Sequence, residues 1–471
     1  MNRLFYTAFM LIAIPLFLGC SSDDDVQPTD DVGQTDDTTD DTTDDTAAAF
    51  LGELDWTQTF GGSGQDFATA VVQTPDGGYA VVGYTQSTDG DITDKSATDS
   101  DFWVFKLASN GSLIWSKTFG GSADDRGADI INTQDGGFAV TGFSRSEDGD
   151  TSSNEGFQDY WIIKLDASGN LLWEQSFGFA GSDQASALIQ TEDGGFFVTG
   201  FLDITASEGQ GNDGFTSAPP AGKTTAKHGV GEFWGLRLDN SGNLIWRRYF
   251  GGTNNDRSYD VMQTNDGGFL MTGSSESNDF DISDPNGSYD FWAVRINNVG
   301  DLLWEKSFGG SQIDISYGMA QAPNGNYILA GDSRSTDGDV SNPIGNADFW
   351  LVSMNSAGNM VWEKSFGGTL FDSARAVKTF DDASIVIAGS SRSNDNHVSA
   401  NYGENDGWLV GASASGGLLW ELNVGGSAID ILSDVIVLAD QTALAVGDTE
   451  STDGDVQLNK GAQDAFIVKL K

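Results

Sequence analysis

The sequence is poor in the residues that most often carry chemistry. It has one cysteine, Cys20, and two histidines, His228 and His397. An internal disulfide is therefore excluded, and a histidine-based catalytic triad or a zinc site would need residues that the chain hardly has. Lys and Arg number 23 against 70 Asp and Glu, and the resulting net charge of −47 repels nucleic acid and anionic membrane surfaces. We expect no nucleic-acid partner.

Residues 1–19 have the pattern of a secretory signal peptide. A charge at Arg3 is followed by an apolar stretch to Leu18 that is too short to span a membrane. The end of this stretch, Leu16-Phe17-Leu18-Gly19-Cys20, resembles the lipobox of bacterial lipoproteins, although Phe17 is bulkier than the usual aliphatic residue. The resemblance implies that Cys20 is lipidated and anchors the chain to a membrane. The alternative is an ordinary signal peptide that happens to contain a cysteine.

Residues 20–50 are expected to be a disordered acidic tether. They carry charge of one sign and almost no apolar side chains until the alanines at their end. Their start, Ser21-Ser22-Asp23-Asp24-Asp25, resembles the signal that exports some lipoproteins to the outer face of the outer membrane. The resemblance implies an outer-membrane, surface-exposed lipoprotein. The alternative is a solvated spacer.

The remaining residues, 51–471, consist of a unit repeated about every 58 residues. Each unit holds four short runs rich in aromatic and β-branched residues, bounded by Gly and Asp, which is typical of β-strands. In the second unit we expect these strands at 128–133, 138–143, 160–165 and 171–177. A period of this length with Gly-rich turns indicates propeller blades.

The two ends of the repeat region complete each other. It begins with one fourth-type strand, at 54–60, and ends with the three strands that follow Ile431. We therefore predict an all-β, seven-bladed β-propeller of four-stranded blades, closed by the N-terminal strand, without a free sheet edge. The chain's 13 tryptophans fall in the third and fourth strands of the blades. Recurrence in nearly every blade favours packing between blades over a sugar-stacking platform.

The run Leu165–Trp173 resembles the tryptophan motif of quinoprotein-like propellers, and the whole unit is similar to repeats of secreted bacterial propeller lipoproteins. The resemblance implies fold and export, but no activity, because the paired cysteines of quinoprotein dehydrogenases are absent. We also find no mannose-binding motif of bulb-type lectins.

Acidic residues recur on the face that carries the inter-blade connections. One Asp lies six residues after the marker residue of each unit, which is Phe in six units and Val424 in the last. These seven residues either line the channel mouth as a carboxylate ring or cap their own turns. Ser-x-Asp-Gly-Asp loops offer oxygen ligands for Ca²⁺, the one cofactor we consider, or else form solvated turns. The candidate metal ligands are Asp89, Asp91, Asp148, Asp150, Asp337, Asp339, Asp453 and Asp455.

Departures from the repeat are better candidates for ligand binding than its regular residues. The third unit has a longer loop that gathers Lys223, Lys227 and His228, and in the sixth unit His397 replaces a loop Asp. An insertion in a tolerant surface loop is the alternative explanation. No catalytic residue stands out.

We therefore expect a monomeric, non-catalytic binding or scaffold lipoprotein that recognises a glycan or an envelope protein through its loop face, with calcium as a candidate stabiliser. One alternative is a polysaccharide-degrading enzyme with paired carboxylates at the channel mouth. Another is a structural member of an envelope complex.

Overall fold

The computed structural model describes residues 50–213 and 228–471. The expected signal peptide, Cys20 and nearly all of the tether lie outside the described residues, as do Lys223 and Lys227. Residues 50–471 form one compact unit. No helix that could cross a membrane occurs in the described ranges.

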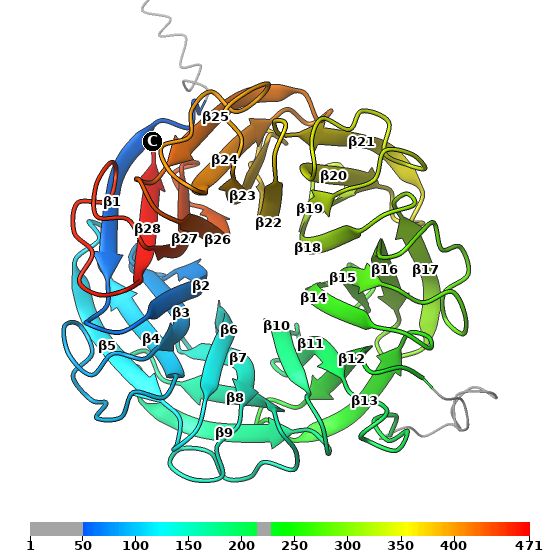
Figure 1. The fold of residues 1–471 in the computed structure, drawn as a ribbon. Helices are drawn as coiled ribbons and strands as arrows, with labels where there is room; N and C mark the ends of the chain where they lie inside the picture. Colours follow the sequence, from blue (N-terminus) through cyan, green and yellow to red (C-terminus); the bar gives the residue numbers. More distant parts are fainter. Residues whose placement is uncertain (1–49, 214–227) are drawn as a thin grey trace, which may run out of the picture. The chain divides into compact units, whose positions relative to one another are not determined.

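Seven four-stranded antiparallel sheets surround a central axis, as predicted (Figure 1). Blades 1 to 3 comprise β2 (Asp66–Gln73), β3 (Tyr79–Thr85), β4 (Asp101–Leu107) and β5 (Leu113–Phe119); β6 (Asp125–Asn132), β7 (Phe138–Ser144), β8 (Asp159–Leu165) and β9 (Leu171–Phe177); and β10 (Gln184–Gln190), β11 (Phe196–Leu202), β12 (Glu232–Leu238) and β13 (Leu244–Phe250).

Blades 4 to 6 comprise β14 (Asp256–Gln263), β15 (Phe269–Ser275), β16 (Asp290–Ile296) and β17 (Leu302–Phe308); β18 (Asp314–Gln321), β19 (Tyr327–Ser333), β20 (Asp348–Met354) and β21 (Met360–Phe366); and β22 (Asp372–Thr379), β23 (Ile385–Ser391), β24 (Asp406–Ala412) and β25 (Leu418–Val424). Blade 7 comprises β26 (Asp430–Val437), β27 (Ala443–Thr449), β28 (Asp464–Leu470) and β1 (Leu54–Phe60).

The ring closes between β1 and β28, which pair antiparallel from Phe60 opposite Ala465 to Leu54 opposite Leu470. The predicted N-terminal strand and its role in closure are confirmed. The predicted first strand of blade 2 begins three residues late, because Asp125 already pairs with Ser144. The first strand of every blade faces the axis, so the seven first strands together line the channel (Figure 1).

Tryptophans of the third strands pack between blades, as predicted. All six are fully buried. Trp161 of β8 makes an edge contact with Phe102 on β4 of the preceding blade, with ring centroids 4.6 Å apart. Three further blade pairs repeat this arrangement, and in a fourth the two rings pack at a tilt. The Trp161 indole also donates to Glu174 on its own fourth strand. Buried aromatic rings therefore hold neighbouring blades together.

Candidate functional site

The Asp that begins each first strand, or directly precedes it in blade 3, is buried and caps a turn. In blade 5, Asp314 accepts hydrogen bonds from the Gly310 amide at 2.8 Å and from the hydroxyls of Ser333 and Ser335. None of the seven equivalent side chains is exposed: Asp66, Asp125, Asp183, Asp256, Asp314, Asp372 and Asp430. The capping alternative is confirmed, and a carboxylate ring at the channel mouth is wrong, because these carboxylates turn into the blades.

The acids of the Ser-x-Asp-Gly-Asp loops bind the same turns from outside. Asp337 accepts from the Ser311 amide at 2.7 Å, and Asp339 accepts from the Gly309 amide at 3.2 Å. The same bonds are made by Asp89 and Asp91, Asp148 and Asp150, and Asp453 and Asp455. Across residues 50–213 and 228–471, no three His, Cys, Asp or Glu side chains are grouped to hold a metal ion. Calcium at these loops stays a prediction without a ligand cage to support it.

At most junctions between blades, a second buried acid lies beside the capping Asp. It is the Asp that begins the third strand of the preceding blade. In blade 4, Asp290 is 2% exposed and accepts from the Asn286 amide at 2.7 Å. A Cβ on Gly309 would lie 2.5 Å from Asp290 Oδ1 and 2.6 Å from Asp314 Oδ2, so only glycine leaves room for both carboxyl groups. Burial raises the pKa of Asp290 to about 7, and its neighbour Asp314 adds to the rise.

This set of junction acids predicts a protein that is more stable in mild acid. Burial raises the pKa of Asp290 to about 7 and those of five equivalents to about 6 or 7: Asp101, Asp159, Asp348, Asp406 and Asp464. The folded state therefore binds more protons than the unfolded chain between about pH 7 and the ordinary Asp pKa of 3.8. Their contribution to the free energy of unfolding is complete below pH 3.8. It falls progressively as the pH rises from there and is lost once the pH has passed through 6 to 7.

We expect the melting temperature to be higher at pH 5.5 than at pH 8. Asp290→Asn removes one of these groups, so its rise should be smaller than that of the unmodified protein. Asp337→Asn is the matched control, because hydrogen bonds lower the pKa of that exposed carboxyl out of the range tested. The melting temperatures are measured by calorimetry at both pH values. An equal change in melting temperature for Asp290→Asn and the unmodified protein would contradict the raised pKa of Asp290.

The two histidines have packing partners in the structure. His228 is buried, lies 3.2 Å from the Glu232 carboxylate and stacks on Phe280 of blade 4 at 4.7 Å. Two departures from the repeat, one in blade 3 and one in blade 4, thus contact each other. His397 Nδ1 accepts from the Gly367 amide at 3.4 Å, the bond that the second loop Asp makes in other blades. A ligand-binding role for either histidine stays a prediction.

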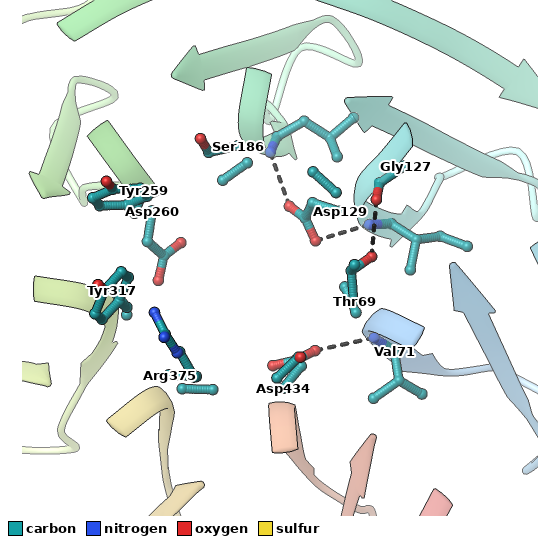
Figure 2. A pocket seen from close by; sticks show the side chains of 18 of the residues that line it. Thr69, Val71, Gly127, Asp129, Ser186, Tyr259, Asp260, Tyr317, Arg375 and Asp434 are labelled. Atoms are coloured by element: carbon teal, nitrogen blue, oxygen red, sulfur yellow. Dashed lines mark hydrogen bonds between the residues drawn. The ribbon is translucent and has the colours of Figure 1, made fainter. Parts of the chain in front are cut away.

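Several residues that differ from the repeat consensus come together in the central channel. A cavity of about 560 Å³ is lined by the first strands of all seven blades. Three positions after the capping Asp, blades 4, 5 and 6 carry Tyr259, Tyr317 and Arg375. The same position in the other blades holds small residues: Thr69, Ala128, Ser186 and Ser433. Figure 2 shows the two tyrosines and Arg375 on one side of the cavity, with Thr69 across it.

One position further along, three blades carry an aspartate where the others carry Ala or Gly. Asp129 accepts from the Leu188 amide of the next blade at 2.9 Å and from its neighbour Ile130 at 2.8 Å. Asp260 accepts from the Met319 amide of the next blade, and Asp434 accepts from the Val71 amide. Figure 2 shows the second of these bonds. Each carboxylate therefore joins adjacent first strands at the channel wall. Accepting two amides leaves lone pairs on each carboxylate for a ligand.

These three acids share the cavity with Lys378. Burial raises the pKa of Asp129 to about 7, with the nearby carboxylates of Asp434 and Asp260 adding to it. Burial also raises the pKa values of Asp260 and Asp434, against the opposing effect of Lys378. Burial works to lower the pKa of Lys378, but the three carboxylates raise it above its ordinary value. The lysine thus remains charged and offsets part of the negative charge of the channel.

Sequence reasoning missed this cluster. A signal was available, because aligning the seven units shows Asp129, Asp260 and Asp434 against Ala70, Ala187, Gly318 and Ala376. The alignment could not show that residues separated by up to about 300 positions face one cavity. That required the closed ring.

No family model matches the chain. A "Regulatory protein FlaEY" of Caulobacter vibrioides is 27% identical over 168 residues, which are 33% of this chain and 17% of that protein. The chain thus spans less than a fifth of that relative.

Three solved structures also resemble the chain. The structure of Sqt1 from Chaetomium thermophilum has 11% identity and a TM-score of 0.42, covering 90% of this chain and 100% of that one. BBS1N in complex with ARL6DN has 9% identity and a TM-score of 0.45, covering 90% and 97%. A gluconolactonase of Xanthomonas campestris has 8% identity and a TM-score of 0.34, covering 72% and 92%. Likenesses at this level carry no argument about activity.

Proposed function

We propose that this chain is a non-catalytic binding lipoprotein, anchored through Cys20 at the outer face of the outer membrane, that captures a saccharide in its propeller channel. The lipobox-like Leu16–Cys20 and the Ser-Ser-Asp-Asp-Asp start support the anchor and the location. The loop face, expected to be the recognition surface, has most of its regular acids engaged in turns. The channel is therefore the better candidate for the binding site.

The observation that carries the proposal is the chemistry of the channel wall. Tyr259 and Tyr317 place their rings 5.1 Å apart on adjacent blades, and Arg375 covers the second ring at 4.1 Å. Aromatic faces bury the apolar side of a sugar ring, and nearby carboxylates accept hydrogen bonds from its hydroxyls. A cavity of about 560 Å³ falls within the usual range for small-ligand sites.

Calorimetric titration of the purified chain with neutral and acidic sugars of the glucose, galactose and mannose series tests the proposal. We expect at least one series to bind, and Tyr317→Ala to weaken that binding about tenfold, the effect of losing one stacked, buried contact. Tyr402→Ala is the control, because Tyr402 is 57% exposed on the loops of blade 6. Absence of binding across all three series would overturn a saccharide-binding function.

A second candidate, hydrolysis of a polysaccharide, has one observation in its favour. Asp129 has its pKa raised to about 7, which suits a general acid, and Asp434 and Asp260 lie in the same cavity. New reducing ends released from a polysaccharide, and lost in Asp129→Asn, would favour this enzyme over the non-catalytic protein. Binding without release of reducing ends would favour the non-catalytic function.

A further inference from the structure

Arg375 lies near one buried carboxylate, that of Asp332, and its positive charge opposes the rise that burial causes in the pKa of that group. Several buried arginines and lysines pair with an Asp on a neighbouring turn, among them Arg237 with Asp193 and Lys164 with Asp135. No ion pair among the described residues includes Arg375, although the channel wall contains three aspartates. Its guanidinium instead lies 4.1 Å from the Tyr317 ring centroid.

The placement of Arg375 leaves room for a ligand beside it. Arg375 is half-buried and lines the cavity next to Tyr317 and Tyr259. Across the cavity, the same strand position holds Thr69, Ala128, Ser186 and Ser433, whose small side chains leave the space open. Figure 2 shows the Arg375 side chain extending along the cavity wall beside Tyr317, with its guanidinium toward Asp260. A guanidinium held on an aromatic face presents a fixed fork of donors that matches the two oxygens of an oxyanion.

The negative charge of the three channel aspartates is partly offset, so the cavity can accept an anionic ligand. Each of the three accepts two backbone amide hydrogen bonds, and the ammonium group of Lys378 interacts with all of them. A second guanidinium, that of Arg126, also lines the cavity and lies 4.9 Å from the Tyr84 ring centroid. The cavity therefore contains three cationic groups beside its three carboxyls, in a chain whose net charge is −47.

We infer that the channel selects an acidic saccharide, whose carboxylate or sulfate group pairs with the Arg375 guanidinium while its sugar ring lies along Tyr259 and Tyr317. This inference rests on the proposed saccharide-binding function and names the class of sugar. The oxyanion is either the carboxylate of a uronic acid or a sulfate ester. Both present paired oxygens to a guanidinium.

Three probes that differ only at one carbon test the inference: a methyl glucoside, the corresponding methyl glucuronide and the methyl glucoside 6-sulfate, with the matching galactose and mannose sets. We expect at least one acidic form to bind the purified chain about tenfold or more tightly than its neutral counterpart, the effect of one charge-assisted hydrogen-bonded pair. Preference for the glucuronide type identifies a uronic acid, and preference for the sulfate identifies an ester.

Arg375→Gln should reduce that preference to about twofold or less while leaving the affinity for the neutral sugar nearly unchanged. Arg145→Gln is the matched control, because Arg145 also covers an aromatic ring, Phe157, at 4.1 Å, but outside the cavity lining. Neutral sugars binding as tightly as acidic ones, or an acidic preference that survives Arg375→Gln, would overturn the inference and leave the proposed function intact. No binding by any sugar would overturn both.

Discussion

Gly331→Ala is expected to lower the free energy of unfolding by about 3 kcal/mol or more. Gly331 lies in β19, opposite the bulge that β18 makes between Ser316 and Gly318. A Cβ at this position would lie 1.8 Å from the carbonyl oxygen of Ile315, far inside contact distance. Because the clashing atom belongs to the backbone of a paired strand, the two strands must separate to relieve it.

The test is urea unfolding of Gly331→Ala beside Gly325→Ala in the same blade. Gly325 has a φ of +85° in the hairpin turn, but a Cβ there would meet nothing within 4 Å. Its substitution should cost only about 1–2 kcal/mol, from backbone strain alone. If Gly331→Ala fails to fold, soluble yield and limited proteolysis rank the two variants. Equal stability of the two variants would contradict the explanation.

Asp314→Ala is the second substitution expected to have a large effect, a loss of about 3 kcal/mol. The change leaves the Gly310 amide and the hydroxyls of Ser333 and Ser335 without their shared acceptor in a region closed to water. Unsatisfied buried donors cost the full desolvation of each group. The loss should appear in urea unfolding as a lower midpoint with an unchanged slope.

Asp337→Ala is the matched control for Asp314→Ala. Asp337 binds the same turn, accepting from Ser311, but this hydrogen bond is exposed. Water can replace it, so the loss should stay within about 1 kcal/mol. If Asp337→Ala lowers the free energy of unfolding as much as Asp314→Ala does, the burial of Asp314 does not explain its effect.

Repetition made the fold predictable. Seven copies of one pattern give seven independent indications of the same four strands, and the unequal ends of the chain imply closure by β1. The packing role of the third-strand tryptophans followed from their recurrence and is confirmed. The recurrence of Asp314 and its equivalents also predicted a structural role correctly, because the Asp caps a turn in every blade.

The same repetition concealed the candidate site. Tyr259, Tyr317 and Arg375 each look like ordinary variation within one unit, as do Asp129 and Asp434. Attention to longer loops favoured His228, which the structure packs between Glu232 and Phe280. Strand alternation alone does not indicate which variable positions face the axis, because the bulge in each first strand shifts the register by one residue.

The sequence by itself determined the propeller, its seven blades, the strand that closes it and the turns between strands, because these depend on local patterns that every copy repeats. The tertiary structure decided what the variable residues do. Closing the ring places residues from 69 to 436 around one cavity, where burial raises the pKa of Asp129 and Arg375 lies over the Tyr317 ring. Proximity across a closed ring and loss of solvent are properties of the whole fold, so no single repeat encodes them.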